Sequence, residues 1–300
     1  MRVEDGFPNL LDQAEEISSR GQRSYMRLTF IGLLMALLAS VGGAVSVDHR
    51  FGDKEIDLGG SLAGLAFLAG IFVAYYLLHT KPERAWYEGR AAAESIKTMA
   101  WQYCVAGGAF GYSATVNADQ IFLDRLRETD RTVRAAQLTL TGVGSQITSE
   151  MRSLRSAPLS ERMARYRSER LELQNSWYAQ KAAYNRRRSR QWFSVAIILQ
   201  GIGLVFAALK TFDVVDVDLL GIVATGAASA SAWLQTKDHQ NLAESYAVTA
   251  RDLLLVLTRA DSHLNSATEE VWRSFVEDAE HAISREHTLW LARRGVQYDE

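Results

Sequence analysis

Residues Leu58–Leu78 read LGGSLAGLAFLAGIFVAYYLL, a run that contains no charged residue. A helix of about 20 apolar residues is long enough to cross the roughly 30 Å of hydrocarbon in a bilayer. Leu28–Val47, LTFIGLLMALLASVGGAVSV, is also uncharged over a similar length and lies a short connection earlier. Together the two runs predict a helical hairpin that crosses a membrane twice.

Two later uncharged runs predict a second hairpin with a weaker signal. Trp192–Leu209 and Leu219–Thr236 are each 18 residues long, the lower end of the spanning range, and the second is rich in Ala, Ser and Gly. A buried helical hairpin of a soluble domain is the alternative for these two runs. We expect both to span, because the order of elements in the first half of the chain recurs in the second.

The charged residues lie outside these runs, and the overall composition excludes some classes of protein. The 300 residues are 48% hydrophobic and 23% charged, with a formal net charge of −2. Neither a general nucleic-acid binder nor an acidic disordered chain is indicated. Only three prolines occur, and apolar residues recur at helical spacing almost throughout. The fold class that we predict is an all-α membrane protein.

An internal repeat organises the chain into two domains. Each half has a basic segment, a span, a short loop, a second span and a further helix, and the tripeptide AES recurs at Ala93–Ser95 and Ala243–Ser245. We predict tandem two-span hairpins, four spans in all, with cytosolic helical bundles. The predicted domains are residues 1–138 and 157–300, joined by a linker at 139–156.

Outside the spans we expect several helices with apolar faces. Their ranges are Glu83–Cys104, Asp119–Arg131, a long helix from about Ser156 into the third span, Lys237–Arg259 and Ala267–Arg293. The long helix carries one stripe of aromatic, apolar and cationic side chains: Tyr166, Arg170, Leu173, Trp177, Lys181 and Tyr184. We favour a bundle core edged by Arg and Lys stems for this stripe, with a nucleotide site as the alternative.

Basic residues predict the orientation in the membrane. Arg2, Arg20, Arg23 and Arg27 precede the first span, whereas the two hairpin loops, Asp48–Asp57 and Thr211–Asp218, are rich in acids. By the positive-inside tendency both loops face outward and both termini face the cytosol. Acidic residues before the first run argue against a cleavable signal peptide. We expect a multi-pass protein of the bacterial inner membrane.

No residue pattern indicates catalysis. The chain has no His-Glu-x-x-His motif, phosphate-binding loop or Gly-x-Ser-x-Gly elbow. Cys104 is the single cysteine, so no intramolecular disulfide is available. His281 and His287 are six residues apart, a poor spacing for two ligands on one helix face. We therefore predict that the protein is not an enzyme and uses no metal or cofactor.

Small and hydroxyl-bearing residues within the spans are candidates for helix packing or for lining a pore. Small residues at i,i+4 spacing allow helix backbones to approach closely; Gly60, Gly64, Gly70 and Gly203 are such positions. The polar span residues Gln200, Thr225, Ser229 and Ser231 either line a water path or pack and bond within the helices. No span carries an acid, Lys or Arg, which argues against an ion-coupled carrier.

Two segments outside the spans resemble a known family. Lys81–Phe110, KPERAWYEGRAAAESIKTMAWQYCVAGGAF, and Arg165–Trp192, RYRSERLELQNSWYAQKAAYNRRRSRQW, are similar to the SLATT group of two-span membrane domains. The resemblance implies an all-α, pore-forming or membrane-disrupting effector of bacterial conflict systems, with nucleotide-synthesising or nucleotide-sensing partners. The residues that carry it are Trp86, Tyr87, Glu88, Gly89, Arg90, Glu94, Trp177 and Tyr178.

The motif and the residues beside it add three expectations. The second exit helix, QTKDHQNLAESYAVTA, lacks the Trp-Tyr-Glu-Gly-Arg part, so the two halves need not share one role. Trp86 and Tyr87 have the amphipathic rings that settle at membrane interfaces. Four arginines adjoin the third span, which favours anionic lipid headgroups over nucleic acid as their partner: Arg186, Arg187, Arg188 and Arg190.

These observations predict an oligomeric membrane effector that permeabilises or perturbs the bilayer and is triggered through its cytosolic helices. Its expected partners are the lipid bilayer, further copies of itself and a nucleotide-sensing or nucleotide-synthesising protein, but no nucleic acid. A non-conducting membrane scaffold that recruits a cytosolic partner is the alternative, and a small channel is a third option.

Overall fold

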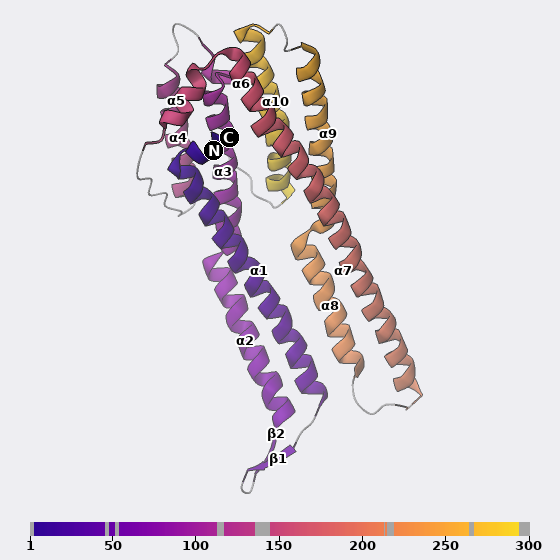
Figure 1. Ribbon diagram of the computed structural model, residues 1–300. Helices are drawn as coiled ribbons and strands as arrows, with labels where there is room; N and C mark the ends of the chain where they lie inside the picture. The colour runs from indigo at the N-terminus through magenta and orange to yellow at the C-terminus, as the bar shows by residue number, and fades with distance from the viewer. Residues whose placement is uncertain are drawn as a thin grey trace. The chain divides into compact units, whose positions relative to one another are not determined.

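The computed structural model describes residues 3–45, 48–51, 54–112, 117–135, 145–212, 214, 219–263 and 267–293 (Figure 1). The predicted all-α fold is confirmed, with one small addition. Strands β1 (Asp48–Phe51) and β2 (Lys54–Asp57) pair antiparallel, Asp48 opposite Asp57, in the first hairpin loop. The helical elements before residue 113 are η1 (Val3–Gly6), α1 (Asn9–Ala44), α2 (Leu58–Thr80), α3 (Pro82–Cys104) and η2 (Gly108–Phe110).

The second part of the chain contains the remaining helices. They are α4 (Ala118–Ala135), α5 (Ser149–Ser156), α6 (Leu159–Arg165), the π-helical segment η3 (Tyr166–Glu172), α7 (Leu173–Thr211), α8 (Leu219–Lys237), α9 (His239–His263) and α10 (Glu269–Arg293). The expected helices outside the spans are all present, with ends within a few residues of the predicted ones. Residues 149–156 of the expected linker form α5, and residues 136–144 lie outside the described residues. The domain boundaries stay a prediction.

Three helical stretches are long and apolar enough to cross a membrane. They are Asn9–Ala44, Leu58–Phe110 and Leu159–Thr211. The second and third contain the second and third predicted spans, and the first contains the first predicted span as far as Ala44. Their apolar segments expose large side chains to the surroundings; on α2, Leu65, Phe67 and Ile71 are each more than 60% exposed. Such exposure is costly in water but suits a bilayer. Helix α8 is not among these stretches, so the fourth span stays a prediction.

The two junctions that follow α2 and α8 have the same backbone geometry. Lys81 (φ 42°) and Asp238 (φ 51°) both adopt the left-handed conformation that ends helices. Each donates its N–H to the carbonyl four residues earlier, Leu77 and Leu234, at 3.0 Å in both cases. Counted from these residues, Glu94 of the first AES comes 13 positions later but Glu244 only six. The tripeptide is therefore out of register, and the matching junctions are the better sign of the repeat.

The described chain divides into two compact units. The first, here called the polar bundle, comprises Met1–Gln22, Glu83–Ala183 and Ala243–Glu300. The second, here called the span unit, comprises Arg23–Pro82 and Tyr184–Leu242. Helices α1 and α7 each contribute residues to both units.

Aromatic side chains form the core of the polar bundle. Phe7, Trp101, Tyr166 and Trp272 make successive edge-on contacts, with ring centroids 5.6, 5.8 and 5.6 Å apart. All four are buried. Edge-to-face pairs add to the stabilisation from burial because the ring edge is positive and the ring face negative. The core thus joins the N-terminal segment, α3, η3 and α10.

Small residues form the buried contacts of the span unit. Its buried apolar residues among those described are Ala39, Ala66, Ala196 and Ala230, besides the glycines considered below. Helices in a bilayer gain little by burying large apolar groups, because lipid tails are equally apolar, and so they pack through small residues. The span unit follows this pattern.

Candidate functional site

The polar residues predicted for the spans bond mainly within their own helices. Thr225 Oγ1 and Ser231 Oγ donate to the carbonyls of Gly221 and Ala227, at 2.9 Å each. Both side chains are half-buried, as is Ser229, whereas Gln200 is exposed. Local bonding of this kind satisfies a hydroxyl without a water path. A pore-lining role for these four residues stays a prediction.

In the span unit, helix backbones approach each other most closely at Gly42 and Gly59, which are not among the predicted glycines. A β-carbon at Gly59 would lie 1.8 Å from the Val45 carbonyl oxygen, and one at Gly42 would lie 2.7 Å from the Gly59 carbonyl oxygen. Gly64 faces open space, and Gly60 faces only the Asp57 carboxylate that caps α2. Gly70 and Gly203 meet Met35 and Val223 at ordinary contact distances. The Gly42–Gly59 crossing could not be predicted, because small-residue spacing within one helix does not reveal the facing helix.

The Trp-Tyr-Glu-Gly-Arg motif lies in the polar bundle and packs α3 against α1. Trp86 and Tyr87 are only 6% and 7% exposed, so their rings pack against the protein, and their placement at the membrane interface stays a prediction. Gly89 is the point of closest approach: a β-carbon there would lie 2.8 Å from the Ser18 backbone nitrogen and 3.0 Å from the Ala14 carbonyl oxygen. Ser18 Oγ donates to the Trp86 carbonyl at 3.1 Å, which fixes the same crossing.

The charged members of this motif lie at the side of the crossing. Arg84 Nε pairs with Glu88 Oε1 at 2.7 Å, one turn apart on α3. Arg90 and Glu94 are half-buried. The Glu94 charge acts on Arg170, and Glu94 lines a cavity of about 340 Å³ together with Thr98, Tyr178 and Glu280. One end of the motif thus lies at the α1–α3 crossing, and Glu94 at its other end lies near a buried ion pair.

Arg170 and Glu280 form that ion pair at the centre of the polar bundle, with side chains 0% and 1% exposed. Arg170 Nη2 and Nε donate to Glu280 Oε2 and Oε1 at 2.7 and 3.0 Å. The Tyr166 hydroxyl donates to Oε1 and the Thr98 hydroxyl to Oε2, both at 2.9 Å. One carboxylate on α10 thus binds α3 and the π-helical segment η3.

The energetics of this network make it a candidate switch. Burial opposes the charge on Arg170, but the Glu280 carboxylate outweighs burial and raises the pKa of the guanidinium. Burial and the Glu280 charge raise the pKa of the Tyr166 hydroxyl well above its usual value. Arg170 Nη1 is buried and has no hydrogen-bond partner among the described residues. Removing a partner from a buried ion pair is strongly destabilising, and π-helical segments are frequent at functional sites.

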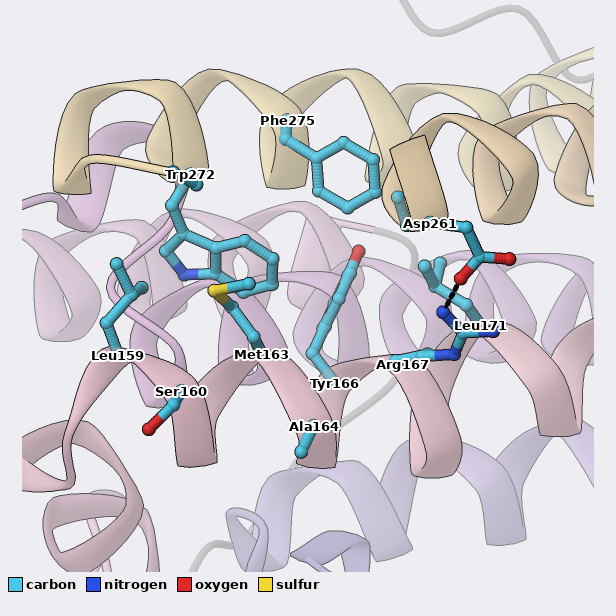
Figure 2. A pocket seen from close by; sticks show the side chains of 12 residues that line it. Leu159, Ser160, Met163, Ala164, Tyr166, Arg167, Leu171, Asp261, Trp272 and Phe275 are labelled. Carbon is cyan, nitrogen blue, oxygen red and sulfur yellow. Dashed lines mark hydrogen bonds and ion pairs between the residues drawn. The ribbon is translucent and has the colours of Figure 1, made fainter. Parts of the chain in front are cut away.

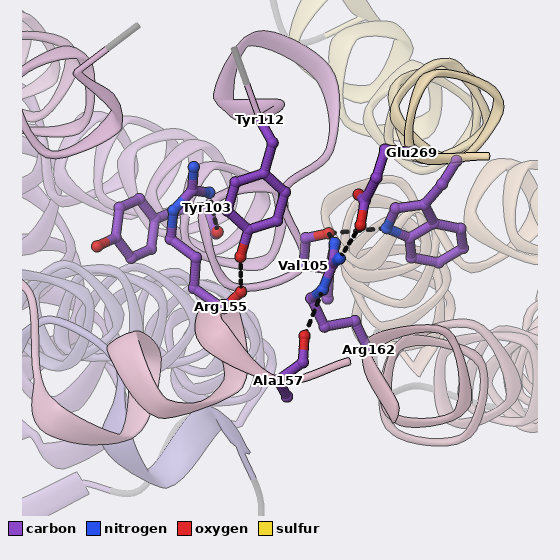
Figure 3. A network of polar contacts seen from close by, with 8 residues as sticks. Tyr103, Val105, Tyr112, Arg155, Ala157, Arg162 and Glu269 are labelled. Atoms are coloured by element: carbon purple, nitrogen blue, oxygen red, sulfur yellow. Dashed lines mark hydrogen bonds and ion pairs between the residues drawn. The ribbon is translucent and has the colours of Figure 1, made fainter. Parts of the chain in front are cut away.

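A second buried arginine anchors the start of the long helix through hydrogen bonds and an ion pair. Arg162, 2% exposed, donates to the Val105 carbonyl at 2.9 Å and the Ala157 carbonyl at 3.1 Å, and pairs with Glu269 (Figure 3). Trp272 Nε1 donates to the same Val105 carbonyl at 2.7 Å. Beside this network, Arg155 donates to the Tyr103 carbonyl at 2.8 Å and accepts a bond from the Tyr112 hydroxyl at its own carbonyl (Figure 3). The chain turns after α3 are thus held by arginines of α5 and α6.

A cavity of about 620 Å³ adjoins the ion pair. Figure 2 shows it between the helix that contains Met163 and Tyr166 and the helix that contains Trp272 and Phe275. Its walls are mostly apolar, and Arg167 and Asp261 pair beside it. The predicted stripe of the long helix is buried only at its beginning, since Leu173, Trp177 and Tyr184 are 43%, 42% and 51% exposed. Beyond Arg170 the buried face of the helix passes instead through Leu171, Tyr178 and Ala182, which the periodicity alone did not reveal.

The other motif residues on α7 differ in their exposure. Tyr178 is buried against Tyr246, with ring centroids 5.6 Å apart, whereas Trp177 remains partly exposed and contacts Lys181. The four arginines further along α7 are all exposed: Arg186, Arg187, Arg188 and Arg190. Trp177 and Tyr178 thus mark the edge of the polar bundle, and the arginines belong to the span unit.

The described residues offer little for chemical catalysis. No group of three or more His, Cys, Asp or Glu among them could hold a metal ion. Cys104 is buried, and burial raises the pKa of its thiol, which disfavours the reactive thiolate. The Glu280 carboxylate is occupied by Tyr166, Thr98 and Arg170. These buried polar groups form hydrogen bonds and an ion pair between helices.

Uncharged helical segments in one unit and a bundle of charged helices with buried ion pairs in the other define an all-α membrane protein. Residues 8–163 match the family model described as SMODS and SLOG-associating 2TM effector domain 3, and residues 166–290 match domain 1 of the same series. The chain belongs to the SLATT family, carries two of its domains in tandem and is a membrane effector protein. No curated protein and no solved structure matches the chain.

Proposed function

We propose that the protein is an oligomeric effector that permeabilises the membrane when a signal acts on the polar bundle. The observation that carries this proposal is the continuity of the long helix. Residues Leu159–Thr211 are helical throughout, from the buried Arg162 and Arg170 to the uncharged third span. A rearrangement at the Arg170–Glu280 pair would be passed along this helix to the span, because a helix moves as a stiff element.

The proposed setting is the bacterial inner membrane, crossed four times, with both termini and the polar bundle in the cytosol. The basic residues beside the spans and the acids in the hairpin loops support this orientation. The family description names association with SMODS and SLOG. We therefore propose a cytosolic partner that synthesises or senses nucleotides, in an antiviral or other conflict system.

Four spans enclose too little space for a wide pore, so conduction requires several copies. The outward face of α2, where Phe67, Ile71 and Phe72 are each 64% exposed in the single chain, is open to lipid or to a neighbouring copy. Narrow apolar throats can gate by dewetting.

A potential-sensitive dye in cells that express the protein tests the proposal. We expect depolarisation on induction or on co-expression of the partner. Insertion is verified separately by protease accessibility. Correct insertion without depolarisation under any inducing condition would contradict the effector mechanism.

A non-conducting scaffold is the second candidate, and one observation favours it. Helix α9 exposes Val248, Leu254 and Leu255 in the polar bundle, at 53%, 57% and 59%. Apolar side chains at this exposure suit recruitment of a partner protein.

Substitution of the α8 hydroxyls separates the two candidates. If the protein conducts, the variant Thr225→Ala/Ser229→Ala/Ser231→Ala reduces depolarisation while cross-linked oligomers persist. Thr236→Ala is the matched control, since Thr236 also bonds to a carbonyl one turn back at 2.9 Å, near the end of α8. Unchanged depolarisation in the triple variant would favour a role independent of these hydroxyls.

A further inference from the structure

A cluster of aromatic and cationic side chains lies where α7 faces the junction of α8 and α9, all within the span unit. Tyr184 is at its centre. Arg188 Nε donates to the Tyr184 hydroxyl at 3.3 Å, and the guanidinium carbon lies 5.4 Å from the ring centroid. The His239 ring meets the Tyr184 ring edge-on, with centroids 6.4 Å apart. The cluster therefore combines one residue pair of α7 with the first residue of α9.

Buried contacts hold this cluster in place. Asn185 and His239 are 6% and 8% exposed, and Asn185 Oδ1 lies 2.7 Å from His239 Nδ1. Lys237 Nζ lies 4.8 Å from the centroid of the Trp233 ring, and Trp233 contacts Trp192 of α7 at 6.5 Å. The cations are thus positioned by the packing of α7 against α8 and α9 rather than by chance at the surface.

The charges in the cluster are predominantly positive. Burial, then the charges of Lys237 and Arg188, lower the pKa of His239, so both cations lie close to the imidazole. Asp238 opposes them, but its Oδ1 accepts a bond from Asn241 at 2.6 Å. Among the described residues no carboxylate forms an ion pair with Arg188 or Lys237. Two positioned cations beside a tyrosine hydroxyl are suited to a phosphate group.

We propose that this cluster binds the phosphate of an anionic phospholipid headgroup. Arg188 and Lys237 contact the phosphate oxygens, the Tyr184 hydroxyl donates to one of them, and Trp192 and Trp233 lie along the glycerol and upper acyl chains, where amphipathic rings settle. The assignment rests on the proposed placement of α8 as a span, because only then does the cluster lie at the membrane surface.

The neighbouring arginines provide a matched control. All three arginines are exposed, but Arg188 is one turn from Tyr184 and bonds to it, whereas Arg186 and Arg187 point to other sides of α7. If the attraction to an anionic surface were diffuse, each of these cations would contribute equally, and removal of any one would lower the affinity roughly fivefold. A built site depends on Arg188 and Lys237 alone.

Native mass spectrometry of the detergent-solubilised full chain, titrated with phosphatidylglycerol or phosphatidylcholine, tests the site. The unaltered protein retains phosphatidylglycerol in preference to phosphatidylcholine. Arg188→Gln/Lys237→Gln loses roughly tenfold more affinity for phosphatidylglycerol than Arg186→Gln/Arg187→Gln, which has the same net charge. Circular dichroism confirms that each variant keeps its helical content.

Three results would overturn the assignment. Equal losses in the two double variants would mean that diffuse charge is sufficient, and no loss in either would mean that no site exists. Binding of glycerol phosphate with the same dependence on Arg188 and Lys237 would assign the cluster to a soluble phosphate ester. Lipid preference is measured without conduction, so a silent dye assay with intact preference contradicts only the proposed function.

Discussion

Arg170 and Glu280 illustrate how a charged pair can sit in a core. Neither residue looks buried in the sequence: Arg170 belongs to a stripe with Lys181, and Glu280 lies between residues of an apolar face. Each charge is tolerated because Tyr166, Thr98 and the partner provide hydrogen bonds. The partners come from segments more than 70 residues apart, which no local pattern can reveal.

The unequal cost of removing one partner or both gives a prediction. Arg170→Met leaves the Glu280 carboxylate buried without its counter-charge, and we expect the full chain to lose about 3–5 kcal/mol of unfolding free energy. Adding Glu280→Gln removes that uncompensated charge yet keeps an oxygen that accepts from Tyr166, so the double variant should recover part of the loss. Denaturant titration in mild detergent measures both variants. A double variant less stable than Arg170→Met would contradict the electrostatic explanation.

At the scale of the elements, most of the helices could be predicted from the sequence and their contacts could not. Uncharged runs and helical periodicity placed α1, α2, α3, α4 and α7 because these patterns are local. Three features depend on facing segments or on backbone detail and were missed: the β1–β2 pairing, the Gly42–Gly59 crossing and the out-of-register AES. The motif residues around Trp86 were recognised, but their burial against α1 was not.

Gly89 gives the prediction for the α1–α3 crossing. A β-carbon there would press on backbone atoms of Ser18 and Ala14, which cannot rotate away, so Gly89→Ala should destabilise the polar bundle by about 1–3 kcal/mol. Gly201→Ala is the matched control, because a β-carbon at Gly201 meets nothing within 4 Å and alanine has the higher helix propensity. Thermal unfolding of both variants in detergent gives the comparison. Equal melting temperatures would show that α1 and α3 separate at no cost to the fold.

At the scale of the whole chain, the two family matches do not coincide with the two structural units. The matches divide the chain near residues 163–166, whereas the polar bundle takes segments from both sides of that division. Its buried bonds cross between the matched domains: Thr98 to Glu280, Arg162 to the Val105 carbonyl, and Trp272 to the same carbonyl. Each SLATT domain therefore completes its partner's core, and we expect that the polar part of one domain cannot be exchanged without the other.

Splitting the chain tests this interdependence. A break within residues 136–144 cuts none of the contacts described above, yet it separates Thr98 and Val105 from Arg162, Trp272 and Glu280. Each half alone would expose the apolar surface and the unpaired charges of one side of the core, so we expect aggregation or proteolysis of either half expressed singly. The two halves expressed together should co-purify through a tag on one of them, and Arg170→Met in the second half should weaken that recovery. A single half that is monodisperse and protease-resistant would contradict a shared core, since it would show that each domain buries its own.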